Sequence, residues 1–213
     1  LVSPRERTVP TAALRPHTTK NAKRGRKSTD FFSRRNRGII EGMRIVFISD
    51  IHGIRHTLEQ TLQEADALGF DKIVLLGDIL YHGPRNGVPA EYDPPGVVSL
   101  LNARRESILA VRGNCDAEVD QMLLDFPLMS DYALLETEET VFFLTHGHIW
   151  NKQHLPFMPR GGIFVQGHTH IAEQSVLANG IVFFNPGSIS LPKGGTPRSY
   201  GYFDGRVLRH IAL

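Results

Sequence analysis

Cysteine is almost absent from this chain of 213 residues, because Cys115 is the single one. An intrachain disulfide is therefore excluded, and the composition is typical of a protein that folds in a reducing compartment such as the cytoplasm. No run approaches the ~18 consecutive apolar residues of a transmembrane helix, so we expect no membrane-spanning segment. A secretory signal is not predicted either, because no apolar stretch follows the basic residues near the start.

Several catalytic signatures are missing as well. The chain has no G-x-S-x-G elbow, which α/β-hydrolases need, and no Walker A sequence, which binds nucleoside triphosphates. A cysteine-dependent tyrosine phosphatase needs an arginine shortly after its nucleophile, whereas Cys115 is followed by Asp116 and Asp120 and by no arginine before Arg160. These absences argue against serine hydrolases, P-loop enzymes and cysteine-based phosphatases.

Basic residues are concentrated at the N-terminal end. Residues 1–42 contain eleven Lys or Arg and three Asp or Glu, a net charge of +8, which leaves −6 for residues 43–213. Residues 1–37 lack apolar periodicity and are predicted to be disordered. Three origins stay open: an overestimated start upstream of Met43, a basic arm for nucleic acid or organelle targeting, or an expression artefact. We therefore expect a basic extension, 1–42, followed by one folded domain, 43–213, whose acidic body does not itself bind nucleic acid.

Apolar periodicity predicts alternating strands and helices in the first half of that domain. The expected elements are a strand at 43–49, a helix at 55–68 closed by Gly69, a strand at 72–76, a helix at 97–105, a strand at 107–111 and a helix at 117–124 capped by Asp116. Such alternation favours a parallel sheet. In the second half, strands are expected at 132–136, 140–145, 163–166, 174–177, 181–184, 199–203 and 207–212. Two packed sheets flanked by helices are the simplest architecture.

Side chains that bind metals recur where five predicted strands end. The motifs are Asp50-Ile-His52, Gly77-Asp78, Gly113-Asn114-Cys115-Asp116, His146-Gly147-His148 and Gly167-His168-Thr169-His170. Each motif alone has a structural explanation such as a turn, but their joint occurrence at strand ends, where open α/β sheets bind ligands, does not. Alternate residues of an extended chain point the same way, so Asp50 and His52 are expected to converge on one ion. His168 and His170 are expected to converge in the same manner.

The kinds of ligand narrow the chemistry. Carboxylate and imidazole groups without a thiolate suit Mn, Fe, Zn, Ni or Co better than a structural zinc site. An aspartate such as Asp78 can bridge two ions through its two oxygens. Two ions about 3.5–4 Å apart clamp the attacking and leaving oxygens of a displacement at phosphorus.

In this order the five motifs resemble the calcineurin-like metallophosphoesterase family, whose pattern is D-x-H, G-D, G-N-x-(D/E), H-G and G-H-x-H. The resemblance covers 43–213, and segments 76–86, 111–116 and 185–188 are most similar to small bacterial YfcE-type phosphodiesterases. It implies a four-layer α/β/β/α sandwich of mixed sheets and two divalent ions, with Mn²⁺ favoured and Ni²⁺, Zn²⁺, Fe²⁺ or Mg²⁺ as alternatives. The implied ligands are Asp50, His52, Asp78 and His170 for the first ion, and Asp78, Asn114, His146 and His168 for the second.

The resemblance also implies a reaction, the hydrolysis of a small-molecule phosphate ester, most simply a phosphodiester, by a hydroxide that bridges the two metals. Many members have a histidine that is proposed to protonate the leaving group, and this chain has Cys115 there. Cys115 itself, His82, His148 or metal-bound water could supply the proton instead. Arg85 could bind phosphate oxygens, because its loop directly follows Asp78.

A second reading is a metal-binding interaction scaffold, like the retromer subunit of this fold, which has lost parts of its metal site. All seven expected ligands are present here, which favours the enzyme. The natural substrate, the metal used in the cell, the general acid and the oligomeric state, including a homo-oligomer, stay open at this stage. Nucleic acid is expected as a partner only of the basic residues 1–37.

Overall fold

The structure of this chain is a computed structural model, and it describes residues 42–213. The predicted disorder of 1–37, and nearly all of the basic extension, lie outside the described residues. No helix within 42–213 combines the length and the apolar character needed to cross a bilayer.

The first sheet has five strands in the order β10-β9-β1-β2-β3. The strands are β1 (Ile45–Ile48), β2 (Lys72–Leu75), β3 (Ile108–Ala110), β9 (Ser199–Phe203) and β10 (Leu208–Ala212). The predicted parallel arrangement of β1, β2 and β3 is confirmed, whereas β9 runs antiparallel to both β1 and β10. The sheet is therefore mixed.

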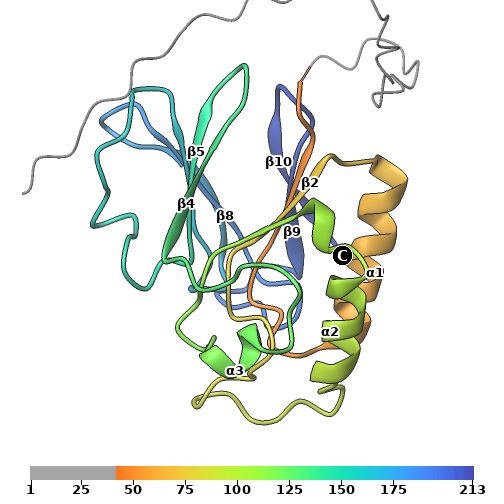
Figure 1. Cartoon of the computed structure of the whole chain (residues 1–213). Helices are drawn as coiled ribbons and strands as arrows, with labels where there is room; N and C mark the ends of the chain where they lie inside the picture. Colours follow the sequence, from red (N-terminus) through yellow and green to blue (C-terminus); the bar gives the residue numbers. More distant parts are fainter. Residues whose placement is uncertain (1–41) are drawn as a thin grey trace, which may run out of the picture. The chain divides into compact units, whose positions relative to one another are not determined.

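Two helices cover one face of this sheet, as Figure 1 shows. Helix α1 (Arg55–Leu68) packs Leu58 and Leu62 against the side chains of β1 and β2 that face it. Helix α2 (Pro94–Asn102) begins three residues before its predicted start. The reason is local: Pro94 suits a first helical position, and the Asp93 carboxylate accepts a 3.0 Å hydrogen bond from Gly96 N–H. A 3₁₀ turn, η1 (Arg105–Ser107), then leads into β3.

The second sheet also has five strands, in the order β4-β5-β6-β8-β7. These are β4 (Tyr132–Glu136), β5 (Val141–Thr145), β6 (Ile163–Val165), β7 (Ala172–Val176) and β8 (Val182–Pro186). Strands β5, β6 and β8 are parallel, and the two edge strands are antiparallel to their neighbours. Both sheets are thus mixed, as predicted.

The main core lies between the two sheets, where Phe47 and Val74 of the first sheet meet Phe142, Leu144 and Phe184 of the second. These side chains are fully buried, which explains why the strands are nearly continuous apolar runs. The predicted α/β sandwich is confirmed. Within the described residues, the outer face of the second sheet packs against the non-helical segment 148–162, in which Met158 is buried, rather than against a helix.

The predicted helix at 117–124 was wrong in its extent and in its cap. Helix α3 spans only Glu118–Gln121, and its N-cap residue is Ala117, whose N–H donates to the Asp120 carboxylate at 2.8 Å. Asp116 does not cap this helix, because its carboxylate is used by the backbone of two neighbouring strand ends.

Candidate metal centre

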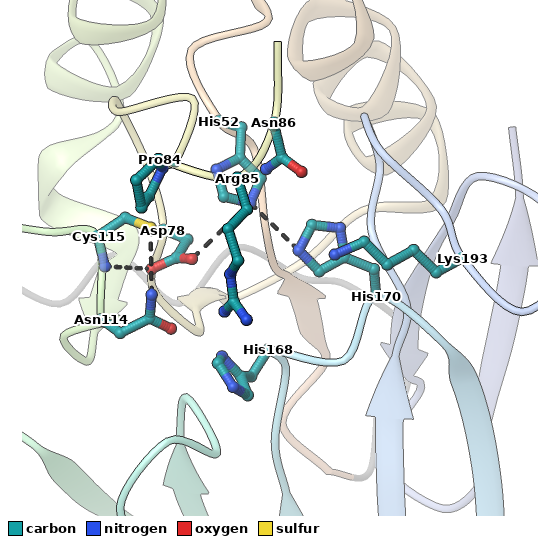
Figure 2. A pocket seen from close by; sticks show the side chains of 11 residues that line it. His52, Asp78, Pro84, Arg85, Asn86, Asn114, Cys115, His168, His170 and Lys193 are labelled. Carbon is teal, nitrogen blue, oxygen red and sulfur yellow. Dashed lines mark hydrogen bonds and ion pairs between the residues drawn. The ribbon is translucent and has the colours of Figure 1, made fainter.

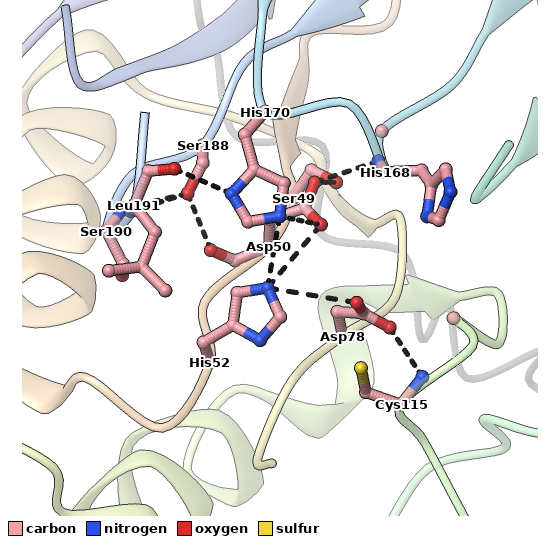
Figure 3. Close-up of polar contacts among 12 residues, drawn as sticks. Ser49, Asp50, His52, Asp78, Cys115, His168, His170, Ser188, Ser190 and Leu191 are labelled. Carbon is pink, nitrogen blue, oxygen red and sulfur yellow. Dashed lines mark hydrogen bonds and ion pairs between the residues drawn. The ribbon is translucent and has the colours of Figure 1, made fainter. Parts of the chain in front are cut away.

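The seven predicted ligand residues all lie where β1, β2, β3, β5 and β6 end, and they form two groups of converging atoms. In the first cluster, His170 Nε2 lies 3.2 Å from His52 Nε2 and 3.3 Å from Asp50 Oδ1. His52 Nε2 lies 3.8 Å from Asp78 Oδ2 (Figure 3). All four of these side chains are buried.

The second cluster is centred on His146, which is fully buried. Its Nε2 atom lies 3.1 Å from Asn114 Oδ1, 3.1 Å from His168 Nδ1 and 3.5 Å from Asp78 Oδ1. Asp78 therefore presents one carboxylate oxygen to each cluster. This is the geometry that a bridging carboxylate requires.

The i, i+2 spacing in an extended chain does not explain how these ligand side chains converge. His168 and His170 do not share a cluster: His168 contacts His146, and His170 contacts His52. Asp50 and His52 do converge, with Oδ1 and Nε2 3.8 Å apart, but their backbone is not extended. Their φ angles are +55° and +51°, in the left-handed region.

Left-handed backbone at residues other than glycine is confined to the centre. The only non-glycine residues with positive φ among residues 42–213 are five predicted ligands: Asp50, His52, Asp78, His168 and His170. This conformation is costly for residues with a Cβ atom, and it persists where the surrounding structure enforces it, usually at functional sites. The chain turns sharply after each strand and aims the side chain across the strand ends.

Backbone carbonyl groups fix the orientation of three histidine rings. Nδ1 of His52 lies 2.8 Å from Tyr81 O, Nδ1 of His146 lies 2.7 Å from Leu76 O, and Nδ1 of His170 lies 2.6 Å from Leu191 O. A carbonyl oxygen only accepts, so each Nδ1 carries the hydrogen and each neutral ring directs its Nε2 lone pair into a cluster.

The segment that follows β8 holds one of these carbonyl groups in place. Ser188 Oγ donates to Asp50 O at 2.8 Å and accepts from Leu191 N–H at 2.8 Å, which ties the support of His170 to the first strand end (Figure 3).

The electrostatic field of the first cluster favours positive charge. Burial opposes ionisation of Asp50, but the neighbouring imidazoles of His170 and His146 hold its pKa well below the usual range. Burial likewise opposes protonation of His170, yet Asp50 raises the pKa of His170 above its ordinary value. For His52 burial prevails, and its pKa is lowered.

The residues present fit divalent metal ions. Ligand atoms about 2.1 Å from an ion lie roughly 3.0–3.4 Å from one another at octahedral or tetrahedral angles. Two contacts in each cluster match this spacing, those at 3.2 and 3.3 Å in the first and the two at 3.1 Å in the second. Asp50 Oδ1 is buried and receives no hydrogen bond of good geometry from the described residues, so it is available to a cation. The mixed donors, without a bound thiolate, suit a catalytic ion rather than a closed structural zinc site.

Asp116 braces the centre from behind. Its two carboxylate oxygens accept hydrogen bonds from the N–H groups of Asp78 at 2.8 Å, Ile79 at 2.8 Å and Gly113 at 2.7 Å. The strand ends that carry Asp78 and Asn114 are therefore joined through one buried side chain. Sequence reasoning missed this role, because an aspartate just before a short helix is a typical N-cap.

A cavity opens over the two clusters, as Figure 2 shows. Cys115 lines it, and so do Arg85, Asn86 and Lys193, of which sequence reasoning missed the last two. His82 does not line this cavity: its ring packs 4.6 Å from that of Tyr81, and its Nδ1 lies 2.8 Å from Gly83 O. The placement gives no support to His82 as a proton donor.

Two further side chains lie near the second cluster. The His148 ring lies 5.4 Å from that of His146, and burial together with the neighbouring His146 lowers the pKa of His148. Burial and the neighbouring Asp78 carboxylate raise the pKa of Cys115 to about 12, so its thiol keeps its proton at neutral pH.

Comparison with known proteins places this site in a family. Residues 43–206 match the model of the calcineurin-like phosphoesterase superfamily domain. The chain belongs to that superfamily. It is 47% identical over 174 residues to the phosphodiesterase YfcE of Escherichia coli K12, covering 80% of this chain and 92% of YfcE. The solved structure of YfcE superposes with a TM-score of 0.78 at 45% identity, covering 80% of this chain and 93% of that one.

A more distant relative extends the comparison. The chain is 28% identical over 168 residues to YsnB of Bacillus subtilis, a probable metallophosphoesterase, with 74% of this chain and 82% of YsnB covered. The resemblance inferred from the five motifs is thereby confirmed. Membership of this superfamily implies divalent metal ions, and the two clusters provide residues to hold them.

Proposed function

We propose that this phosphoesterase domain hydrolyses phosphodiesters with two divalent cations, Mn²⁺ by preference. The observation that carries the proposal is Asp78, whose two oxygens face two separate groups of ligand atoms. Asp50, His52 and His170 would complete the first site, and Asn114, His146 and His168 the second. The 47% identity to a phosphodiesterase supports a diester as the substrate. The start of the family match at residue 43 supports a domain that spans 43–213.

The ions, when bound, would activate a water molecule and neutralise the phosphate oxygens. Asp78 would hold the two sites at a fixed separation. The backbone carbonyl groups that accept hydrogen bonds from Nδ1 of His52, His146 and His170 would keep those rings correctly oriented. In the net reaction, water forms a new bond to phosphorus, the bond from phosphorus to the leaving oxygen breaks, and one proton of the water is released.

Of the candidate proton donors, neither Cys115 nor His148 is a strong acid at neutral pH. The Cys115 thiol has a pKa of about 12, raised by burial and by Asp78, and is too weak an acid to assist much. The pKa of His148 is lowered by burial and by His146, so its ring is mostly neutral. We therefore expect a preference for esters whose leaving group is stable as an anion, such as nitrophenolate.

The test is to strip the protein of metal with a chelator and to restore Mn²⁺, Mg²⁺, Ni²⁺ or Zn²⁺ one at a time. Hydrolysis of bis(p-nitrophenyl) phosphate and p-nitrophenyl phosphate is followed for the native chain and for Asp78→Asn and His146→Ala. Asp125→Asn, a change at an exposed carboxylate far along the chain from any ligand, is the matched control.

Metal-dependent hydrolysis of the diester, lost in both site variants and kept in the control, is the expected result. If folded native protein turns over neither ester with any of the four metals, the proposal is wrong, and the interaction scaffold becomes the better explanation.

A further inference from the structure

Two cationic side chains line the cavity over the clusters and come from different parts of the chain. Arg85 lies in the loop between β2 and α2, and Lys193 lies between β8 and β9. Both side chains are exposed. The ion pairs of the described residues include neither of them, although Arg44, Arg55, Arg104, Arg112, Lys152 and Arg209 all have an acidic partner.

Each cation is presented by a hydrogen-bonded turn. In the first turn, Asn86 N–H donates to Gly83 O at 3.3 Å, and Asn86 Nδ2 donates to His82 O at 2.8 Å. Figure 2 shows the Arg85 guanidinium directed from this turn toward the space between Asn114 and His168.

In the second turn, Thr196 donates to Lys193 O from both its N–H, at 3.1 Å, and its hydroxyl, at 2.9 Å. Lys193 N–H donates to His170 O at 2.9 Å, which anchors the turn to a ligand of the first cluster. Lys193 and His170 line the same cavity, and Figure 2 shows the Lys193 side chain extending beside the His170 ring.

The cavity carries more positive charge than is needed to bind a phosphodiester with a single negative charge. Asp50 and Asp78 face the sites for the metal ions, and the charge of Asp116 is met by three backbone N–H groups. A phosphodiester bears one negative charge, which the metal centre itself neutralises. Arg85 and Lys193 remain without a counter-charge from the described residues, and complementary sites place anionic groups opposite such cations.

We propose that Arg85 and Lys193 bind a second anionic group of the substrate, carried by the substituent that is not cleaved. The natural substrate is then a phosphodiester with an additional carboxylate or phosphate a few bonds from the scissile phosphorus. This inference rests on the proposed phosphodiesterase function and narrows its substrate class. Lys193 is the specificity-determining residue, because Arg85 also reaches the space in which the scissile phosphate would lie.

The experiment compares two esters with the same leaving group, methyl p-nitrophenyl phosphate and 2-carboxyethyl p-nitrophenyl phosphate. The first carries one negative charge and the second carries two at mildly alkaline pH. The measured quantity is the ratio of their kcat/KM values with Mn²⁺-loaded protein. One additional ion pair at an exposed site changes this ratio about 1.5- to fivefold.

We expect the native chain to prefer the carboxyethyl ester, Lys193→Gln to lose most of that preference, and Lys193→Arg to retain it. Lys72→Gln is the control for net charge, because Lys72 lies at the start of β2, at the opposite end of the strand from the centre. The ratio in this control should match the native ratio. High salt should weaken the preference, since screening acts on exposed charges.

Hydrolysis of the methyl ester without a preference for the carboxyethyl ester would overturn the subsite while leaving the phosphodiesterase function intact. A preference that Lys193→Gln leaves unchanged would overturn it as well. Failure to hydrolyse either ester would instead remove the phosphodiesterase function on which the subsite depends.

Discussion

Replacing Asp116 by asparagine should destabilise the protein, although the change adds no volume and removes no predicted metal ligand. The carboxylate accepts three backbone hydrogen bonds, two at Oδ2 and one at Oδ1. An asparagine side chain has only one acceptor oxygen, so its NH₂ group must face at least one of these N–H groups. The lost bond was made to a charged acceptor in a buried position, where such bonds contribute about 1.5–3 kcal/mol.

A second buried aspartate provides the matched control. Asp116 and Asp120 are 8% and 7% exposed, and burial raises the pKa of both carboxyl groups, that of Asp116 to about 6. At mildly alkaline pH, above the pKa of about 6, the Asp116 carboxyl group is ionised. Asp120 accepts one hydrogen bond, from Ala117 N–H, which an asparagine oxygen can still accept. Both variants remove a buried carboxylate, but only Asp116→Asn also leaves a backbone N–H group without an acceptor.

We expect Asp116→Asn to lower the free energy of unfolding by ~2 kcal/mol more than Asp120→Asn, which corresponds to about 4–8 °C in Tm for a domain of this size. Urea unfolding of the metal-free variants at mildly alkaline pH measures the difference. Mn²⁺ affinity should fall in Asp116→Asn as well, because Asp78 moves with its backbone. Equal stabilities of the two variants would refute the bracing role of Asp116.

Three further outcomes follow from the geometry of the centre. Elemental analysis after dialysis against Mn²⁺ should find two ions per chain in the native protein and one per chain in His170→Ala and in His146→Ala. It should find fewer than one in Asp78→Asn. Two ions in Asp78→Asn would contradict a bridging role of Asp78. Gly113→Ala should lower Mn²⁺ affinity at least tenfold, because its new Cβ would overlap Asp78 Oδ1, and unchanged affinity by calorimetry would show that the loop gives way. Iodoacetamide at mildly alkaline pH should alkylate Cys115 far more slowly in folded metal-free protein than in urea. The reason is that burial, and then Asp78, raise the pKa of Cys115 to about 12. Equal rates of alkylation would show an accessible thiolate.

The secondary structure was predictable where apolar periodicity is strong. The helix at 55–68 and the strands at 132–136 and 199–203 were predicted with their observed bounds. Errors occurred where side-chain hydrogen bonds set the boundary, as at Asp93 before α2 and Asp120 in α3. Such hydrogen bonds shift a helix end by only a few residues. The apolar pattern, which is averaged over a longer window, does not detect that shift.

The amino-acid order by itself determined which residues could form the centre, because five motifs of ligand-type side chains each follow an apolar strand. Local spacing did not determine how these residues are shared between the clusters: the family resemblance implied the division, and the tertiary structure supplies its physical basis. Left-handed backbone separates His168 from His170, and parallel strands from the two sheets bring Asp50 and His146 together with Asp78. Lys193 and Asp116 acquired their places in the same way, because contacts across 23 and 38 residues of chain depend on packing that no local pattern records.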